Sequence, residues 1–122
     1  YSGIPLTHRD HAQSCIFVTG HLKEGKVDLN WEKLIQPNQT IVFYMGLVSI
    51  DIICSQLIKF GLDPKTPCAL VEQGTTRNQK VYTSTVDEMN NLVEQEKPSA
   101  PTIFIIGYVV TLRDKLNWYK SD

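Results

Sequence analysis

The chain has 122 residues, of which 42% are hydrophobic and 20% are charged. This length suits one domain, and the composition excludes collagen, low-complexity disorder and a coiled coil. Twelve Lys and Arg against thirteen Asp and Glu give a net charge of −1, and no apolar run reaches the ~20 residues of a membrane span, so we expect neither a nucleic-acid nor a membrane partner.

The cysteines and the N-terminus indicate the compartment. Cys15, Cys54 and Cys68 are odd in number and widely spaced, which favours free thiols over a disulfide framework. The first five residues lack the charged and apolar regions of a signal peptide. We therefore expect a cytoplasmic protein. The chain begins with Tyr1 rather than Met, which suggests a processed chain or a fragment.

The first third of the chain alternates apolar and polar segments. Ser14–Thr19 is predicted to be a short strand, and 20–28 a polar loop. A short helix is expected at 30–35, with Asn30 as its N-cap. The β-branched and aromatic residues of 40–45 predict a buried strand.

An amphipathic helix is predicted after Gly46. Five apolar side chains at helical spacing form one stripe: Ile50, Ile53, Cys54, Leu57 and Ile58. Gly61 suits the position just beyond the end of this helix, because glycine readily adopts the left-handed conformation found there.

The next segment contains two strands and a helix. Pro67–Glu72 is predicted to be a strand that ends in a turn at Gly74, and 79–84 a second strand. Thr85 and Glu88 fit a capping box, in which the Thr85 hydroxyl accepts a hydrogen bond from the Glu88 amide. The helix that follows is expected to bury three side chains, Met89, Leu92 and Val93.

The last segment begins with an apolar strand. Thr102–Ile106 is predicted to be this strand, with an extension through Val109 and Val110. The tail, 112–119, is predicted to be helical or irregular, with three side chains on one side: Leu112, Leu116 and Tyr119.

This element order predicts an α/β fold with a mixed sheet flanked by helices. The strands are almost continuously apolar, which implies that both faces of the sheet are covered. Ligands of open α/β sheets gather beyond the carboxyl ends of strands. Two such ends are followed by glycine, at Met45–Gly46 and at Glu72–Gly74.

The sequence contains no self-contained catalytic set, so we assign no catalytic residue. GxGxxG, Walker and GxSxG motifs are absent, and Cys54 lies on the apolar stripe of its helix. His8 and His11 have metal-pair spacing, but no nearby cysteine or carboxylate set completes a site, and we assign no metal. The cluster around Arg9 is either a solvated loop or a loop that grips an anion or a substrate carboxylate.

Met45 and Gly74 each allow two interpretations. A methionine at a strand end usually belongs to the core, and most such glycines only make turns. Either residue could instead contact a ligand, since a thioether packs on flat rings and a glycine lets a ligand approach the backbone.

Six segments together resemble one family in order and spacing. They are YSGIPLTHRD from Tyr1, VTGH from Val18, TIVFYMG from Thr40, PCALVEQGT from Pro67 with Gln79, IIGYVVTLR from Ile105, and LNW from Leu116. This set is similar to the C-terminal half of the uroporphyrinogen-III C-methyltransferases, the tetrapyrrole methylase module also found in sirohaem synthases. The resemblance covers essentially the whole chain.

The resemblance implies a fold, an activity and a cofactor. Family members are homodimeric two-domain α/β enzymes that methylate uroporphyrinogen III to precorrin-2, for sirohaem and cobalamin, with S-adenosyl-L-methionine as methyl donor. Their cofactor lies between the two domains. The chain corresponds to the second domain, 1–122 as a single domain, and the N-terminal half with its glycine-rich loops is absent. We therefore expect the isolated chain to be inactive.

The resemblance also suggests roles for individual residues. Met45 and Gly74 match cofactor-contacting positions of the family. Thr7, His8 and Arg9 match a motif that contacts either substrate propionates or the dimer partner. Two alternatives stay open: a related methylase acting on later corrin precursors, on protein or on RNA, and a non-catalytic binding or dimerisation module.

Overall fold

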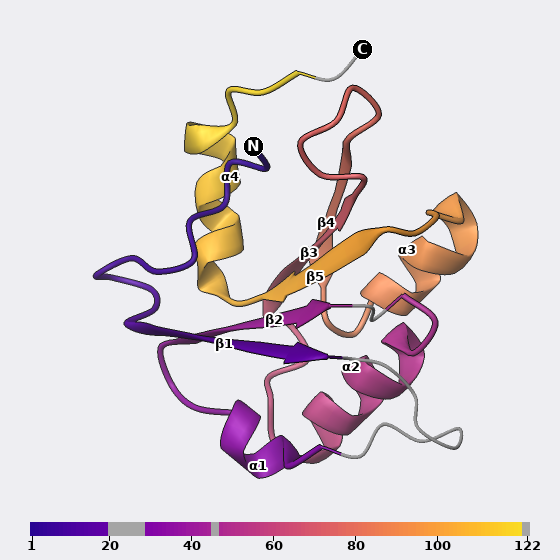
Figure 1. Ribbon diagram of the computed structural model, residues 1–122. Helices are drawn as coiled ribbons and strands as arrows, with labels where there is room; N and C mark the ends of the chain where they lie inside the picture. The colour runs from indigo at the N-terminus through magenta and orange to yellow at the C-terminus, as the bar shows by residue number, and fades with distance from the viewer. Residues whose placement is uncertain (20–28, 45–46, 121–122) are drawn as a thin grey trace.

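The computed structural model describes residues 1–19, 29–44 and 47–120. Within them, five strands form one sheet in the order β1-β2-β5-β3-β4 (Figure 1). The strands are β1 (Ser14–Thr19), β2 (Gln39–Tyr44), β3 (Pro67–Glu72), β4 (Lys80–Thr85) and β5 (Thr102–Ile106). β1 and β2 are parallel and every other neighbouring pair is antiparallel, which confirms the predicted mixed sheet.

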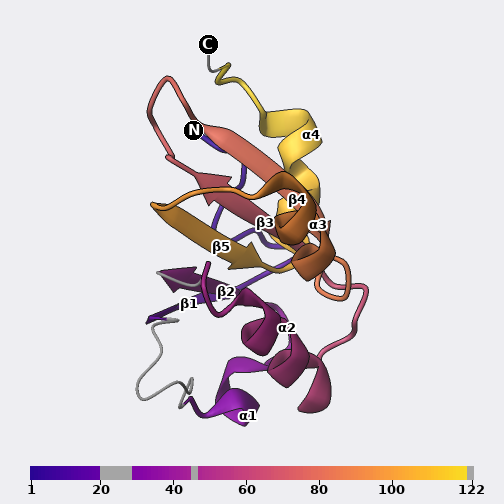
Figure 2. The same cartoon turned by 90° about the vertical axis from the view of Figure 1, so that its right-hand side faces the viewer.

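Three helices cover one face of the sheet (Figures 1 and 2). They are α1 (Trp31–Leu34), α2 (Ile50–Lys59) and α3 (Met89–Glu96). The predicted stripe of α2 is buried at Ile50, Ile53, Cys54 and Leu57, and Ile58 is half-buried. These side chains pack with Met89 of α3 on the aromatic rings of Phe43 and Phe104, whose centroids are 6.3 Å apart.

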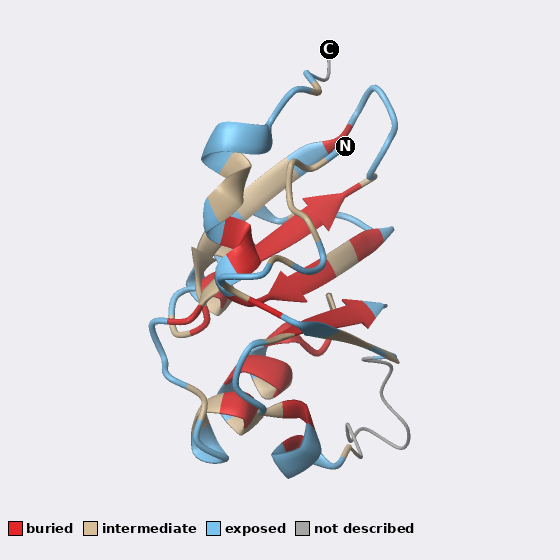
Figure 3. Ribbon diagram, turned by 90° about the vertical axis from the view of Figure 1, so that its left-hand side faces the viewer, coloured by how far each residue is buried: buried red, intermediate tan, exposed pale blue. Residues whose placement is uncertain are grey.

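The opposite face is covered by the two ends of the chain. There the 3-10 helix η1 (Tyr108–Leu112) and α4 (Arg113–Leu116) lie beside the N-terminal segment (Figure 1). Val110 is buried against Val42, Ala69 and Ile105, with Ile4 packed on this cluster. Figure 3 shows that the central strands are buried, whereas the edge strand β1 is largely intermediate or exposed.

Several local predictions are confirmed. The Asn30 side chain accepts a hydrogen bond from the amide of Lys33 and caps α1. α2 ends at Lys59, and Gly61 follows with a φ of 112°, a conformation that L side chains rarely adopt. Cys15, Cys54 and Cys68 are free thiols, of which the last two are buried.

The predicted capping box at Thr85 is wrong. α3 begins only at Met89, and the Thr85 hydroxyl donates to the carboxylate of Asp87 instead of accepting from Glu88. The same carboxylate accepts from the ammonium of Lys65 at 2.8 Å. An ionised carboxylate is a stronger hydrogen-bond acceptor than a neutral oxygen. The Thr85 hydroxyl therefore bonds to Asp87 and does not cap the helix.

The predicted extension of the last strand is also wrong. Gly107 has a φ of 147° and turns the chain out of β5, so Val109 and Val110 belong to η1. The tail is helical in α4 and irregular after it, as expected, and Leu116 is 48% exposed.

Two predictions fall outside the described residues: the loop at 20–28 and the last residue of the second strand, Met45. Within the described part of the chain, none of the helices combines the length and the apolar character needed to cross a bilayer.

Candidate functional site

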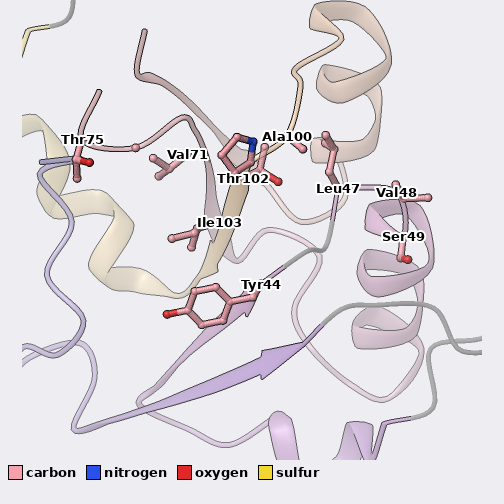
Figure 4. A pocket seen from close by; sticks show the side chains of 11 residues that line it. Tyr44, Leu47, Val48, Ser49, Val71, Thr75, Ala100, Thr102 and Ile103 are labelled. Carbon is pink, nitrogen blue, oxygen red and sulfur yellow. The ribbon is translucent and has the colours of Figure 1, made fainter. Parts of the chain in front are cut away.

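A pocket of about 770 Å³ opens at the edge of the sheet where β2 and β3 end and β5 begins. Its lining residues are Tyr44, Leu47, Val48, Ser49, Val71, Gly74, Thr75, Ala100, Pro101, Thr102 and Ile103 (Figure 4). The carboxyl ends of two strands therefore meet at one cavity, as expected for a ligand site of an open α/β sheet.

Three strands provide the apolar floor of the pocket. Ile103 of β5 stands opposite Tyr44 of β2 on one side and opposite Val71 of β3 on the other. In register pairs of this kind the side chains lie on the same face of the sheet, and Figure 4 shows all three beside one another. An apolar surface of this type suits an aromatic or aliphatic part of a ligand.

The loop after β3 forms one wall. The Thr75 amide donates to Gln79 Oε1 at 2.7 Å, and the Thr76 hydroxyl donates to the Gln73 carbonyl at 2.8 Å. None of the hydrogen bonds that order the described loop uses the amide or the carbonyl of Gly74. That backbone is therefore able to bond to a ligand.

The same loop is conformationally strained on both sides of Gly74. Gln73 and Thr75 are non-glycine residues in the left-handed region, with φ of 48° and 70°. Such strain is concentrated at ligand sites and is sustained by the surrounding structure. At Gly74 itself an added Cβ would lie 3.3 Å from Cγ1 of Val71, so a side chain there would crowd the floor of the pocket.

The facing wall comes from the segment before β5 and from the start of α2. The Pro101 carbonyl accepts from the Gln73 amide at 2.9 Å, which ties this wall to the end of β3. On the α2 side, Ser49 is buried and Val48 is 84% exposed at the rim.

Of the two predicted cofactor residues, the structure describes Gly74 but not Met45. Gly74 lines the pocket. Met45 lies outside the described residues, although its nearest described neighbours, Tyr44 and Leu47, line the same pocket. Their contact with a cofactor stays a prediction.

Thr7, His8 and Arg9 do not line this pocket. They lie in a turn before β1, in which the His8 amide donates to the Ala12 carbonyl at 2.8 Å and the Asp10 amide donates to His8 Nδ1 at 3.1 Å. Arg9 is exposed. β1 and β2 are parallel and this turn precedes β1, so it lies at the opposite end of these strands from the pocket. The role of the turn in substrate or partner contact stays a prediction.

The described residues that line the pocket include no cysteine, histidine or carboxylate. Burial, helped by the negative charge of Asp51, raises the pKa of the Cys54 thiol to about 12, which disfavours a thiolate nucleophile. In the described part of the chain, no group of three or more His, Cys, Asp or Glu side chains is placed to hold a metal ion.

Sequence reasoning missed the floor residues. Tyr44, Val71 and Ile103 were interpreted as parts of buried strands, and only the strand pairing shows that they are neighbours. The available signal was weak: Tyr44 ends an apolar strand directly before a glycine turn.

Comparison with known proteins places this fold in a family. The model of the Tetrapyrrole (Corrin/Porphyrin) Methylases matches residues 1–90. Siroheme synthase of Ectopseudomonas mendocina is 59% identical over 121 residues, and that of Pseudomonas aeruginosa is 56% identical. Each alignment covers 99% of this chain and 26% of the relative.

Solved structures agree with this assignment. Native uroporphyrin III C-methyl transferase from Thermus thermophilus superposes with a TM-score of 0.73 and 30% identity, over 91% of this chain and 47% of that one. The same enzyme complexed with S-adenyl homocysteine gives a TM-score of 0.72. Cobalt precorrin-4 methyltransferase is similar in fold, with a TM-score of 0.78 at 17% identity.

The chain belongs to the tetrapyrrole methylase family. It spans about a quarter of the length of the curated siroheme synthases and about half of the solved methyltransferases that it matches.

Proposed function

We propose that this chain is the C-terminal domain of an S-adenosylmethionine-dependent methyltransferase that acts on uroporphyrinogen III, on the path to sirohaem and cobalamin. The observation that carries the proposal is the pocket at the ends of β2 and β3, with an apolar floor and an unengaged glycine backbone in its wall. The similarity to siroheme synthases and to a uroporphyrin-III C-methyl transferase complexed with S-adenyl homocysteine supports the same chemistry.

The residues of the pocket fit an adenosine-containing ligand. Tyr44, Val71 and Ile103 offer a flat apolar surface to a purine ring, and the Gly74 amide and carbonyl offer a donor and an acceptor to its edge. From the family resemblance we propose that the Met45 thioether contacts the same ring. When bound, the cofactor supplies an electrophilic methyl group. The chain's own contribution is to orient that cofactor and to exclude water from one side of it.

The other side of the cofactor site belongs to an N-terminal half of the kind present in the longer relatives. Ligand sites of this sort bury most of the ligand's surface, and the described pocket encloses one side. The isolated 122-residue chain is therefore proposed to be inactive and to bind S-adenosylhomocysteine weakly or not at all. The free thiols of Cys15, Cys54 and Cys68 support a reducing, cytoplasmic location.

A homodimer is part of this proposal. Phe17 of the edge strand β1 is 51% exposed, and its ring is stacked 5.9 Å from that of Tyr44, a pocket residue of the neighbouring strand β2 that is 43% exposed. Exposed apolar patches favour association. Light scattering that gives a monomer mass at every concentration would overturn this part of the proposal.

The test of function is methyl transfer by the full-length protein from labelled S-adenosylmethionine to uroporphyrinogen III. We expect two methyl groups per substrate, and no transfer above background by the isolated chain. Binding of S-adenosylhomocysteine without transfer would point to another tetrapyrrole substrate. Absence of S-adenosylhomocysteine binding by the full-length protein would refute the proposal and leave a non-catalytic module.

A further inference from the structure

The last residue of β3, Glu72, has a buried carboxylate. Glu72 is 6% exposed, and a buried carboxylate destabilises a fold unless hydrogen bonds compensate for its lost hydration. Its Oε1 accepts a short hydrogen bond, 2.6 Å, from the backbone amide of Ser99. A bond from an amide to an ionised carboxylate is about twice as strong as a neutral one, so this contact is strong enough to orient a segment.

The segment that Glu72 holds leads directly into the pocket wall. Ser99 lies in the connection between α3 and β5 and is followed by the lining residues Ala100, Pro101 and Thr102. This connection is neither helix nor strand. The bond from the Lys97 amide to the Val93 carbonyl holds one end of it, the strand pairing that begins at Thr102 holds the other, and the Glu72 contact lies between them.

Both walls of the pocket are thus attached to the last residues of one strand. The backbone of β3 continues through Gln73 into the Gly74 wall, whereas the Glu72 side chain reaches across to the facing wall at Ser99. A second bond, from the Gln73 amide to the Pro101 carbonyl, runs beside it at 2.9 Å. The two walls are therefore joined by one backbone bond, from Gln73 to Pro101, and by one side-chain bond, from Ser99 to the Glu72 carboxylate.

We infer that Glu72 is a positioning residue of the cofactor pocket, which sets the gap between the Gly74 loop and the segment 99–102 without touching the cofactor. This inference rests on the proposed function. Because the carboxylate acts through the wall rather than on the ligand, losing it should alter cofactor affinity and leave tetrapyrrole recognition unchanged.

The experiment is calorimetric titration of S-adenosylhomocysteine into the full-length protein. The stoichiometry gives the fraction of protein that is folded and able to bind, and the Kd gives the affinity of those sites. The two values therefore separate unfolding of the protein from displacement of the pocket walls. Glu72→Ala is expected to weaken binding by about tenfold with unchanged stoichiometry. Glu72→Gln keeps an acceptor oxygen at the same place and is expected to stay within about threefold of the parent protein.

The matched control lies at the other end of β3. Thr66 is also buried, and its hydroxyl donates to the Asp63 carbonyl at 2.7 Å, far from the pocket. Thr66→Val is expected to lower the melting temperature without changing Kd. The KM for S-adenosylmethionine should rise in Glu72→Ala, while the KM for the tetrapyrrole should not.

The outcomes are separable. If the parent protein binds and Glu72→Ala binds equally well, the positioning role is wrong while the proposed function stands. If Thr66→Val weakens binding as much as Glu72→Ala, the effect is general destabilisation, and the inference fails. If the parent protein does not bind, the proposed function has failed first, and the inference fails with it.

A second variant covers the case in which Glu72→Ala does not fold. Ser99→Pro removes the donor amide at an exposed position and leaves the carboxylate in place. It is expected to weaken S-adenosylhomocysteine binding in the same way, and an unchanged Kd would overturn the inference.

Discussion

The hydroxyl of Tyr119 donates a hydrogen bond of 2.8 Å to the carbonyl of Thr76, two residues beyond Gly74. The C-terminal tail therefore supports the loop that forms one wall of the pocket. The N-terminus joins the same support, because the Tyr119 ring lies 4.9 Å from that of Tyr1, whose carbonyl accepts from Gln79 Nε2 at 3.3 Å.

Tyr119→Phe is expected to lower the free energy of unfolding by about 1 kcal/mol, because one hydrogen bond is lost while the ring remains. Urea unfolding measures this change. Tyr108→Phe is the control, since the Tyr108 side chain is 49% exposed on η1 and away from the loop. Equal stability of the two variants would contradict a supporting role for the Tyr119 hydroxyl.

Gly74→Val is expected to weaken S-adenosylhomocysteine binding by the full-length protein by at least about tenfold. The new side chain would crowd Cγ1 of Val71 and fill the space that a purine edge requires. Met45→Ala should cost less, about 1–2 kcal/mol, through lost packing. Calorimetry beside thermal melts is the measurement. Unchanged affinity in both variants would mean that neither residue contacts the cofactor. A large fall in the melting temperature of Met45→Ala would mean that Met45 belongs to the core.

Native alkylation is expected to distinguish the three thiols. Burial raises the pKa of Cys54 to about 12 and raises that of Cys68 further, so neither should react with iodoacetamide at pH 8. Cys15 is half-buried, with a smaller upward pKa shift from the same cause, and should react slowly. Mass spectrometry after peptide digestion gives the labelled positions. Labelling of Cys68 before denaturant is added would contradict its burial.

Asp87 is expected to make stability depend on pH at the acidic end. The hydrogen bond from Lys65, then that from Thr85, lowers the pKa of the Asp87 carboxyl below its usual value. The folded state therefore holds the ionised form more strongly than the unfolded state does. The resulting stabilisation is present above the unfolded pKa and is lost as pH falls through the folded pKa.

The variant that tests this effect is Asp87→Asn, with Asp114→Asn as an exposed control on α4. Asp87→Asn should flatten the dependence of the melting temperature on pH below about 4, because the group that titrates is gone. If the melting temperature of Asp87→Asn falls with acid as steeply as that of the parent protein, the contact between Asp87 and Lys65 contributes nothing to the dependence of stability on pH.

The strands were predictable from the sequence because local composition determines them. β1 and β3 have the predicted bounds, and β5 has them without the predicted extension, since each is an apolar run closed by polar residues, glycine or proline. The error at the capping box arose because a distant partner competes with a local one. Lys65 lies 22 residues from Asp87, and their contact accompanies the side-chain network that displaces the capping box at Thr85.

The pocket was predictable only in part. Gly74 could be singled out because a glycine after a strand end suggests close backbone approach. Its floor could not be, because Ile103 becomes the neighbour of Tyr44 and Val71 only through the antiparallel insertion of β5 between β2 and β3. Pairing of this kind depends on residues far apart in the chain, and no local pattern encodes it.

The central place of β5 has a consequence for the order in which the chain folds. Before residues 102–106 leave the ribosome, β1–β2 and β3–β4 are two separate ribbons whose inner edges have no partner. Because synthesis adds about 5–20 residues per second, this open state persists for only a few seconds at most. A chain that stopped at residue 100 would keep four of the five strands, yet it should expose two unpaired edges and aggregate.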